Sequence, residues 1–199
     1  MVLTQDTIHT YLPYYLTVEA KAGIINELNK FHLGEMQYFI FHGFEHEMLQ
    51  GDAWTRLQLR NYATGEKIGV NGVVLSNTCD VDPENKRDLP INITFAPLVP
   101  VHAYTALLIQ AGVPKASVDD KIAAMKRQEV TNIFYVPAGG SVESEHFVLL
   151  GDIHSMPAKV YEEDSAKNKI FTLSQAGFYL FILKLSMHFC RFHENVIRG

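Results

Sequence analysis

The stretch SNTCDVDPENKR, from Ser76 to Arg87, ends an apolar run and collects groups that could act on a phosphodiester. Metal-independent RNA cleavage needs a base for the 2′-hydroxyl proton, a cation or N–H donors for the charged phosphorane, and an acid for the leaving 5′-oxygen. Asp80 is the candidate base, with Asp82 as its alternative. Arg87 is the candidate phosphate ligand, because a guanidinium donates two parallel hydrogen bonds. His102 is the candidate acid, because an unperturbed imidazole has a pKa of about 6.5.

Four further side chains of this stretch could bind or orient the substrate. They are Ser76, Asn77, Thr78 and Lys86. A simpler interpretation gives them no chemical role: Asn77, Thr78 and Asp80 would cap a turn, and residues 82–88 would form a solvated loop. The sequence leaves both interpretations open.

Two other clusters contain residues that can bind metals. His42, Glu45 and His46 match H-x-x-E-H, in which two histidines on one helix face bind zinc and the glutamate acts as base. Gly43 weakens a helix at that place, and no third ligand is marked. On a helix, His188 and Cys190 would point about 200° apart, which disfavours a shared metal. We therefore expect no metal and no cofactor.

Composition narrows the class of protein. The chain has 199 residues, 47% hydrophobic and 20% charged, so it can build a real core. Its net charge is −5, whereas proteins that bind nucleic acids without sequence preference usually carry a basic surface. Two distant cysteines and an N-terminus without signal-peptide features predict a reduced, cytoplasmic protein. The apolar segment 176–190 is shorter than the roughly 20 residues that span a bilayer, so we expect a buried helix and no membrane contact.

The elements that must position these residues follow from periodicity. Residues 1–48 are mostly helical in pattern, 49–165 form a β unit with a helical insert at about 103–131, and 166–199 form a C-terminal helix. Ser117 and Ser174 are the expected N-caps of two helices. Strands are expected in DAWTRLQLRNY, IGVNGVVLS, INITFAPLVPV, TNIFYVPA and EHFVLLGDIHSMPA. Without βαβ crossovers, this order predicts one α+β domain built on a small barrel.

The order of five short motifs resembles the MazF/PemK family of toxin proteins. The motifs are QGDAW, GVVLSN, NITFAPLV, NIFYV and SEHFVLLGDIHSMPA, and the resemblance covers roughly residues 50–160. It implies an SH3-like barrel and a cytoplasmic, often dimeric protein. It also implies a metal-independent endoribonuclease that causes growth arrest in a toxin–antitoxin or phage-defence system. RNA and an inhibitory or activating partner protein are the implied partners.

Two departures from the family pattern bear on activity. The family places an arginine before its second strand, where this chain has Val70, Asn71 and Gly72. The family's hydroxyl at the end of the next strand would fall at 98–100, where none is present. Two hypotheses remain. The chain is an endoribonuclease with a rearranged site at Ser76–Arg87 and His102, or it is a catalytically degenerate barrel that binds protein or nucleic acid as a regulatory module.

Overall fold

A computed structural model describes residues 17–31, 36–40, 42–82, 84–85 and 88–189. The described strands are all antiparallel and follow the order β1-β8-β2-β3-β4-β6-β5, with β7 paired to β4. Their bounds are β1 Phe39–Ile40, β2 Ala53–Arg60, β3 Lys67–Val74, β4 Asn92–Pro100, β5 Ile133–Val136, β6 His146–Leu149, β7 His154–Pro157 and β8 Lys169–Leu173. The expected strands are confirmed, and the α+β class with them.

The sheet does not close into a barrel among the described residues. β1 and β5 stand at its two ends and do not pair with each other. Strand β4 is the longest, and it changes partner along its length. Its first half pairs with β7, from Asn92 with Pro157, and its last residues pair with β6, from Leu98 with Val148. The start of β4 therefore lies beside β7, and its end lies beside β6.

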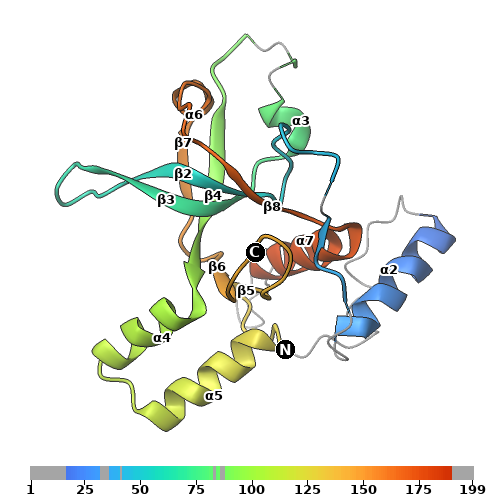
Figure 1. The fold of residues 1–199 in the computed structure, drawn as a ribbon, viewed down its shortest axis with the longest axis vertical. Coiled ribbons are helices and arrows are strands. Elements are labelled where there is room, and N and C mark those ends of the chain that lie inside the picture. Colours follow the sequence, from blue (N-terminus) through green and yellow to red (C-terminus); the bar gives the residue numbers. More distant parts are fainter. Residues whose placement is uncertain (1–16, 32–35, 41, 83, 86–87, 190–199) are drawn as a thin grey trace, which may run out of the picture.

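The helices lie around this sheet. Their bounds are α2 Val18–Phe31, α3 Thr78–Val81, α4 Val101–Gln110, α5 Lys115–Lys126, α6 Ala158–Glu162 and α7 Gln175–Phe189. The expected insert is confirmed as the α4–α5 pair, which projects from one end of the molecule, whereas α3 and α6 lie at the opposite end (Figure 1). None of the helices within the described ranges is long and apolar enough to cross a membrane.

Of three expectations about the helices, one is confirmed and two differ from the structure. Helix α5 begins at Lys115 after Pro114, so the predicted N-cap at Ser117 is wrong; proline with φ near −57° already sets up the first turn. Ser174 is confirmed as an N-cap, because its Oγ accepts from the Gly177 amide at 3.1 Å. The region predicted as C-terminal helix first contains β8, since the apolar run at 169–173 pairs with β1 and β2.

Three hydrophobic cores lie among the described residues, and the smallest joins the α4–α5 pair to β5 and β6. The α7 core packs strand residues such as Phe134 and Phe171 against Leu180 and Phe181 of α7. The Trp54 core consists of buried side chains from β2, β3, α3, β4, β7 and α6. Its largest members include Trp54, Leu57, Val74, Phe95 and Tyr161.

Candidate functional site

Ser76 and Thr78 use their hydroxyls to hold the end of β3 in place. Ser76 Oγ accepts from the backbone amide of Thr94 on β4 at 2.8 Å. Thr78 Oγ1 accepts from the amide of Gln50 at 3.0 Å. Both hydroxyls therefore accept from backbone amides, which supports the structural interpretation of this turn.

Asn77 begins the single turn of α3. Its side chain accepts from the amide of Cys79 at 3.0 Å, which is the usual action of an N-cap. Asn85 closes the turn by donating to the Cys79 carbonyl oxygen at 2.8 Å. Asp80 is an exposed residue in the first turn of α3. It lines a shallow hollow of about 500 Å³ together with Ser76 and residues of β4.

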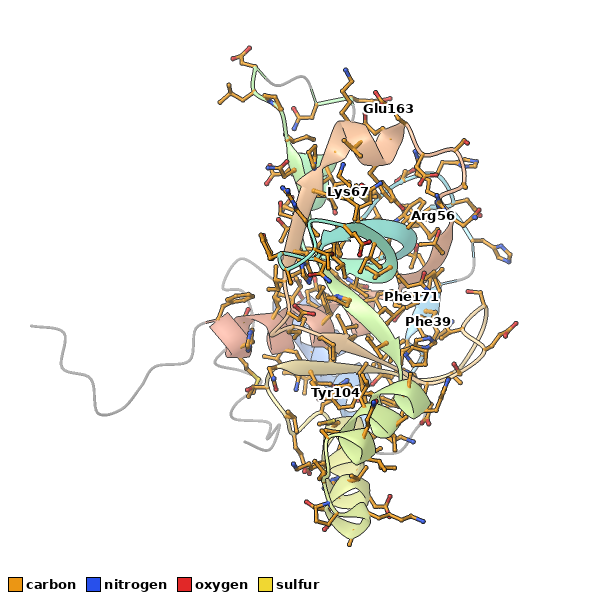
Figure 2. The ribbon with its side chains drawn as sticks, turned by 90° about the vertical axis from the view of Figure 1, so that its left-hand side faces the viewer. Phe39, Arg56, Lys67, Tyr104, Glu163 and Phe171 are labelled. Carbon is orange, nitrogen blue, oxygen red and sulfur yellow. The ribbon has the colours of Figure 1, made fainter. Side chains whose placement is uncertain are left out.

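His102 lies far from this hollow. It is in the first turn of α4, just after β4 ends, whereas the hollow contacts Asn92 and Thr94 at the start of β4. The six residue-to-residue steps of strand from Thr94 to Pro100 span about 20 Å. In Figure 2, Tyr104 of α4 lies in the lower half of the molecule and Glu163, after α6, lies near its top. The structure thus brings Ser76 and Asp80 together and places the expected acid elsewhere.

Two other predicted site residues, Lys86 and Arg87, lie outside the described residues. Asp82, the alternative base, ends α3 as its C-cap and accepts from the Glu84 amide at 2.9 Å. His102 is near His146, whose pKa is lowered mainly by burial and further by the charge of His102. This neighbour belongs to β6, on the α4 side of the sheet.

The H-x-x-E-H segment does not form the helix that its zinc motif requires. Residues 42–46 form neither helix nor strand, and Glu45 Oε1 accepts from the Gly43 amide at 3.1 Å. Within the described part of the chain, no group of three or more His, Cys, Asp or Glu side chains is arranged to hold a metal ion. Cys190, the other suggested ligand, lies outside the described residues.

A larger cavity opens beside α3, and the sequence did not point to it. This α3–α6 pocket has a volume of about 660 Å³, in the range of ligand sites. Its walls come from the segment before β2, from β2, α3, β4 and α6, and from the loop that follows α6. The lining residues are His46, Glu47, Met48, Leu49, Trp54, Thr78, Val81, Asp82, Glu84, Ile93, Ala158, Tyr161, Glu162 and Lys167.

An aromatic pair forms the centre of this pocket wall. The rings of Trp54 and Tyr161 meet edge to face, with centroids 6.3 Å apart and an interplanar angle of 88°. Tyr161 donates its hydroxyl proton to the Thr55 carbonyl oxygen at 3.0 Å, which fixes the ring. The buried Trp54 Nε1 has no acceptor among the described residues. Buried indole N–H groups in folded proteins usually have a hydrogen-bond acceptor, so this one is unusual.

A buried ion pair adjoins the same tryptophan. Lys169 Nζ lies 2.6 Å from Asp52 Oδ2 and 5.1 Å from the centroid of the Trp54 ring. Asp52 is 1% exposed, and burial raises the pKa of its carboxyl even though Lys169 and the Leu49 amide act against the rise. The pair ties the start of β2 to β8 and so holds Trp54 in place.

Sequence reasoning missed the pocket because its walls carry no chemical motif. Trp54 and Ile93 follow strand alternation, and Tyr161 lies in a region read only as the end of the β unit. The one available signal was a lone tryptophan opening a strand. No family model, curated protein or solved structure matches this chain.

Proposed function

We propose that this chain is a MazF/PemK-like module that acts by binding a partner protein at the α3–α6 pocket, as the regulatory or effector part of a toxin–antitoxin or phage-defence system. The observation that carries the binding role is the pocket itself, an apolar cavity with an aromatic wall and a charged rim. The biological setting comes from the motif order at residues 50–160 alone.

The hydrogen bonds made by the turn at Ser76 and Thr78 favour a binding function over catalysis. The hydroxyls of Ser76 and Thr78 already accept backbone protons, and His102 is about 20 Å along β4 from the hollow. The pocket rim carries more carboxylates than cations, a poor match for a phosphate backbone. A neutral or basic protein segment avoids the repulsion that these carboxylates would exert on phosphate groups.

Site-directed photo-crosslinking in the source cells tests the binding role. A photoreactive amino acid replaces Glu84 on the pocket rim in one variant and Tyr62, which is 91% exposed on the β2–β3 hairpin, in the matched control. A discrete protein adduct is expected from position 84 and not from position 62. Equal labelling at both positions, or no adduct at 84, would contradict the proposal.

A second candidate function is endoribonuclease activity, favoured by one observation: Ser76 and Asp80 share a hollow at the end of the buried β3 strand. The purified chain would be incubated with long mixed-sequence RNA in EDTA, and the cut ends sequenced. Asp80→Ala and Arg87→Ala proteins run beside it to exclude a contaminating nuclease. Cuts at a short recurring motif that vanish in both variants would establish this function in place of the first.

A further inference from the structure

We propose that the occupant of the α3–α6 pocket is a basic, amphipathic protein segment, with an aliphatic side chain on the Trp54–Tyr161 wall and lysine or arginine side chains at the rim. This inference rests on the proposed binding function and specifies the chemistry of the partner. It follows from three properties of the pocket: its charge, its apolar wall and one unsatisfied donor.

The rim is acidic. Its carboxylates come from the segment before β2, from the end of α3 and the residues after it, and from α6. They are Glu47, Asp82, Glu84 and Glu162. None of them forms an ion pair with a residue that the structure describes. Against these four stands one ammonium, that of Lys167, so the lining carries three excess negative charges when His46 is neutral.

Lys167 does little to neutralise them. Its Nζ donates to the carbonyl oxygens of Tyr161 and Glu162 and lies 5.5 Å from the centroid of the Tyr161 ring. The ammonium is therefore held against the end of α6, and the carboxylates remain open to a cation from outside. Unpaired carboxylates around a low-dielectric wall attract cations more strongly than the same charges spread over open surface.

The apolar wall of the pocket favours an aliphatic side chain next to the cation that binds at the rim. Val81, Ile93 and Ala158 pack with the Trp54–Tyr161 pair in one core, and half-buried Met48 and Leu49 add accessible apolar surface to the pocket. An aliphatic side chain placed here is stabilised in proportion to the apolar surface that it removes from water. Lysine and arginine add to this gain, because their methylene stems cover apolar surface while the charged end stays at the rim.

The Trp54 indole gives a reason to expect a polypeptide. Its Nε1 is buried, belongs to a side chain that lines the pocket, and lacks an acceptor among the described residues. A backbone carbonyl oxygen of an extended segment is an acceptor that accompanies every residue. Because this Nε1 is itself covered in the structure, a bound segment accepts from it only after the Trp54 ring shifts.

Trp54 also makes the proposal measurable, because it is the only tryptophan of the chain. The purified full-length protein would be titrated with a short peptide of alternating lysine and leucine, with excitation selective for tryptophan. A saturable change in Trp54 emission is expected, with a Kd on the order of 10 µM. Added salt should weaken the affinity severalfold, because the rim contacts are exposed.

Two comparisons decide the result. The same peptide with glutamate in place of lysine should leave the emission unchanged. Glu162→Gln should weaken lysine–leucine binding about threefold, the effect of one exposed charge contact. Glu163→Gln, at the neighbouring exposed residue that does not line the pocket, should leave the affinity unchanged. Equal binding of both peptides, or equal effects of the two variants, would overturn the inference.

The two proposals fail in different ways. A protein adduct at position 84 whose contacting segment is acidic would leave the binding function standing and refute the basic occupant. Saturable, salt-sensitive binding of the lysine–leucine peptide that is weakened by Glu162→Gln supports the basic occupant whatever the cells contain. Absence of any adduct at position 84 counts against the function alone.

Discussion

The α7 core and the Trp54 core both contain residues of the sheet, but helices of different length pack on them. The α7 core lies under a helix of 15 residues, and Ala176, Leu180, Phe181, Leu183 and Met187 of that helix are buried in it. The Trp54 core is covered near its edge by α3 and α6, of four and five residues. Short elements cover less surface, and the α3–α6 pocket lies beside them.

The difference shows where this protein can hold a ligand. Gly177 lets α7 approach β1 so closely that a Cβ there would lie 2.5 Å from the Tyr38 carbonyl oxygen. Helix and sheet leave no room between them at that point. In the Trp54 core, the aromatic pair is 6% and 2% exposed, yet it borders a cavity of about 660 Å³. The open core is therefore the region suited to binding, and the closed core supplies stability.

The Asp52–Lys169 pair connects the two cores, and breaking it should have the largest effect. Ala53 beside Asp52 belongs to the α7 core, and Trp54 belongs to the other. Asp52→Asn would leave the ammonium of Lys169, which is 11% exposed, without its charged partner. We expect a loss of about 3 to 5 kcal/mol in the free energy of unfolding. Urea denaturation of the variant measures it.

The control for this prediction is the double variant Asp52→Asn with Lys169→Met. Removing both charges should recover part of the lost stability, because no unpaired buried charge remains. If the double variant is as unstable as the sum of the two single variants, the pair does not act as a unit and the connecting role is wrong.

Gly177→Ala tests the close packing of the α7 core. In an open helix, alanine is about 1 kcal/mol better than glycine. Here the new Cβ would meet backbone at 2.5 Å, so we expect a net loss of about 2 to 3 kcal/mol. Gly23→Ala on α2 is the matched control, because its Cβ would meet nothing within 4 Å. A gain at both glycines in thermal unfolding would show that α7 is not tightly packed.

Lys184 gives the closed core a pH dependence. It is fully buried on α7, and its Nζ donates to the carbonyl oxygens of Gln128 at 2.8 Å and Val130 at 2.6 Å. Burial lowers the pKa of its ammonium from 10.5 to about 8. Between these values the unfolded chain binds more protons than the folded one. Stability should therefore rise with pH, by about 2 kcal/mol from pH 7 to pH 9.5.

Lys184→Met isolates this contribution. The variant should lack the rise in denaturant midpoint that wild type shows over this range. The measurement should stop below about pH 10, where tyrosines begin to ionise in the unfolded chain. Burial raises the pKa of Tyr161, which lowers stability as the pH rises further. Parallel pH profiles for the two proteins would mean that Lys184 keeps its ordinary pKa.

Much of the fold was accessible from the sequence, because its signals are local. Alternation and β-branched runs located β2, β3 and β4, and the N-cap at Ser174 located the start of α7. The open sheet formed by the described strands could not be predicted, since closure depends on pairing between β1 and β5, strands far apart in the chain. Short β8 was missed because a five-residue apolar run has no clear period.

The site was harder to predict than the fold, and for a physical reason. Polar residues in Ser76–Thr78 attracted attention by type, but their partners, the amides of Gln50 and Thr94, are visible only in three dimensions. The pocket wall is made of residues that sequence analysis assigns to a core. Whether a buried aromatic is covered or lines a cavity depends on the length of the elements above it, not on the residue itself.

Ser76→Ala gives the smallest expected effect and tests the edge of the open core. It removes the acceptor of the Thr94 amide, so we expect a loss of about 1 kcal/mol in stability. Ser155→Ala on β7, where the exposed serine pairs in register with Thr94, is the matched control and should change stability by less than about 0.5 kcal/mol. If Ser76 has only a structural role, Ser76→Ala should leave peptide binding unchanged. RNA cleavage present in wild type and abolished by Ser76→Ala, with the fold intact, would instead make this turn a catalytic rim.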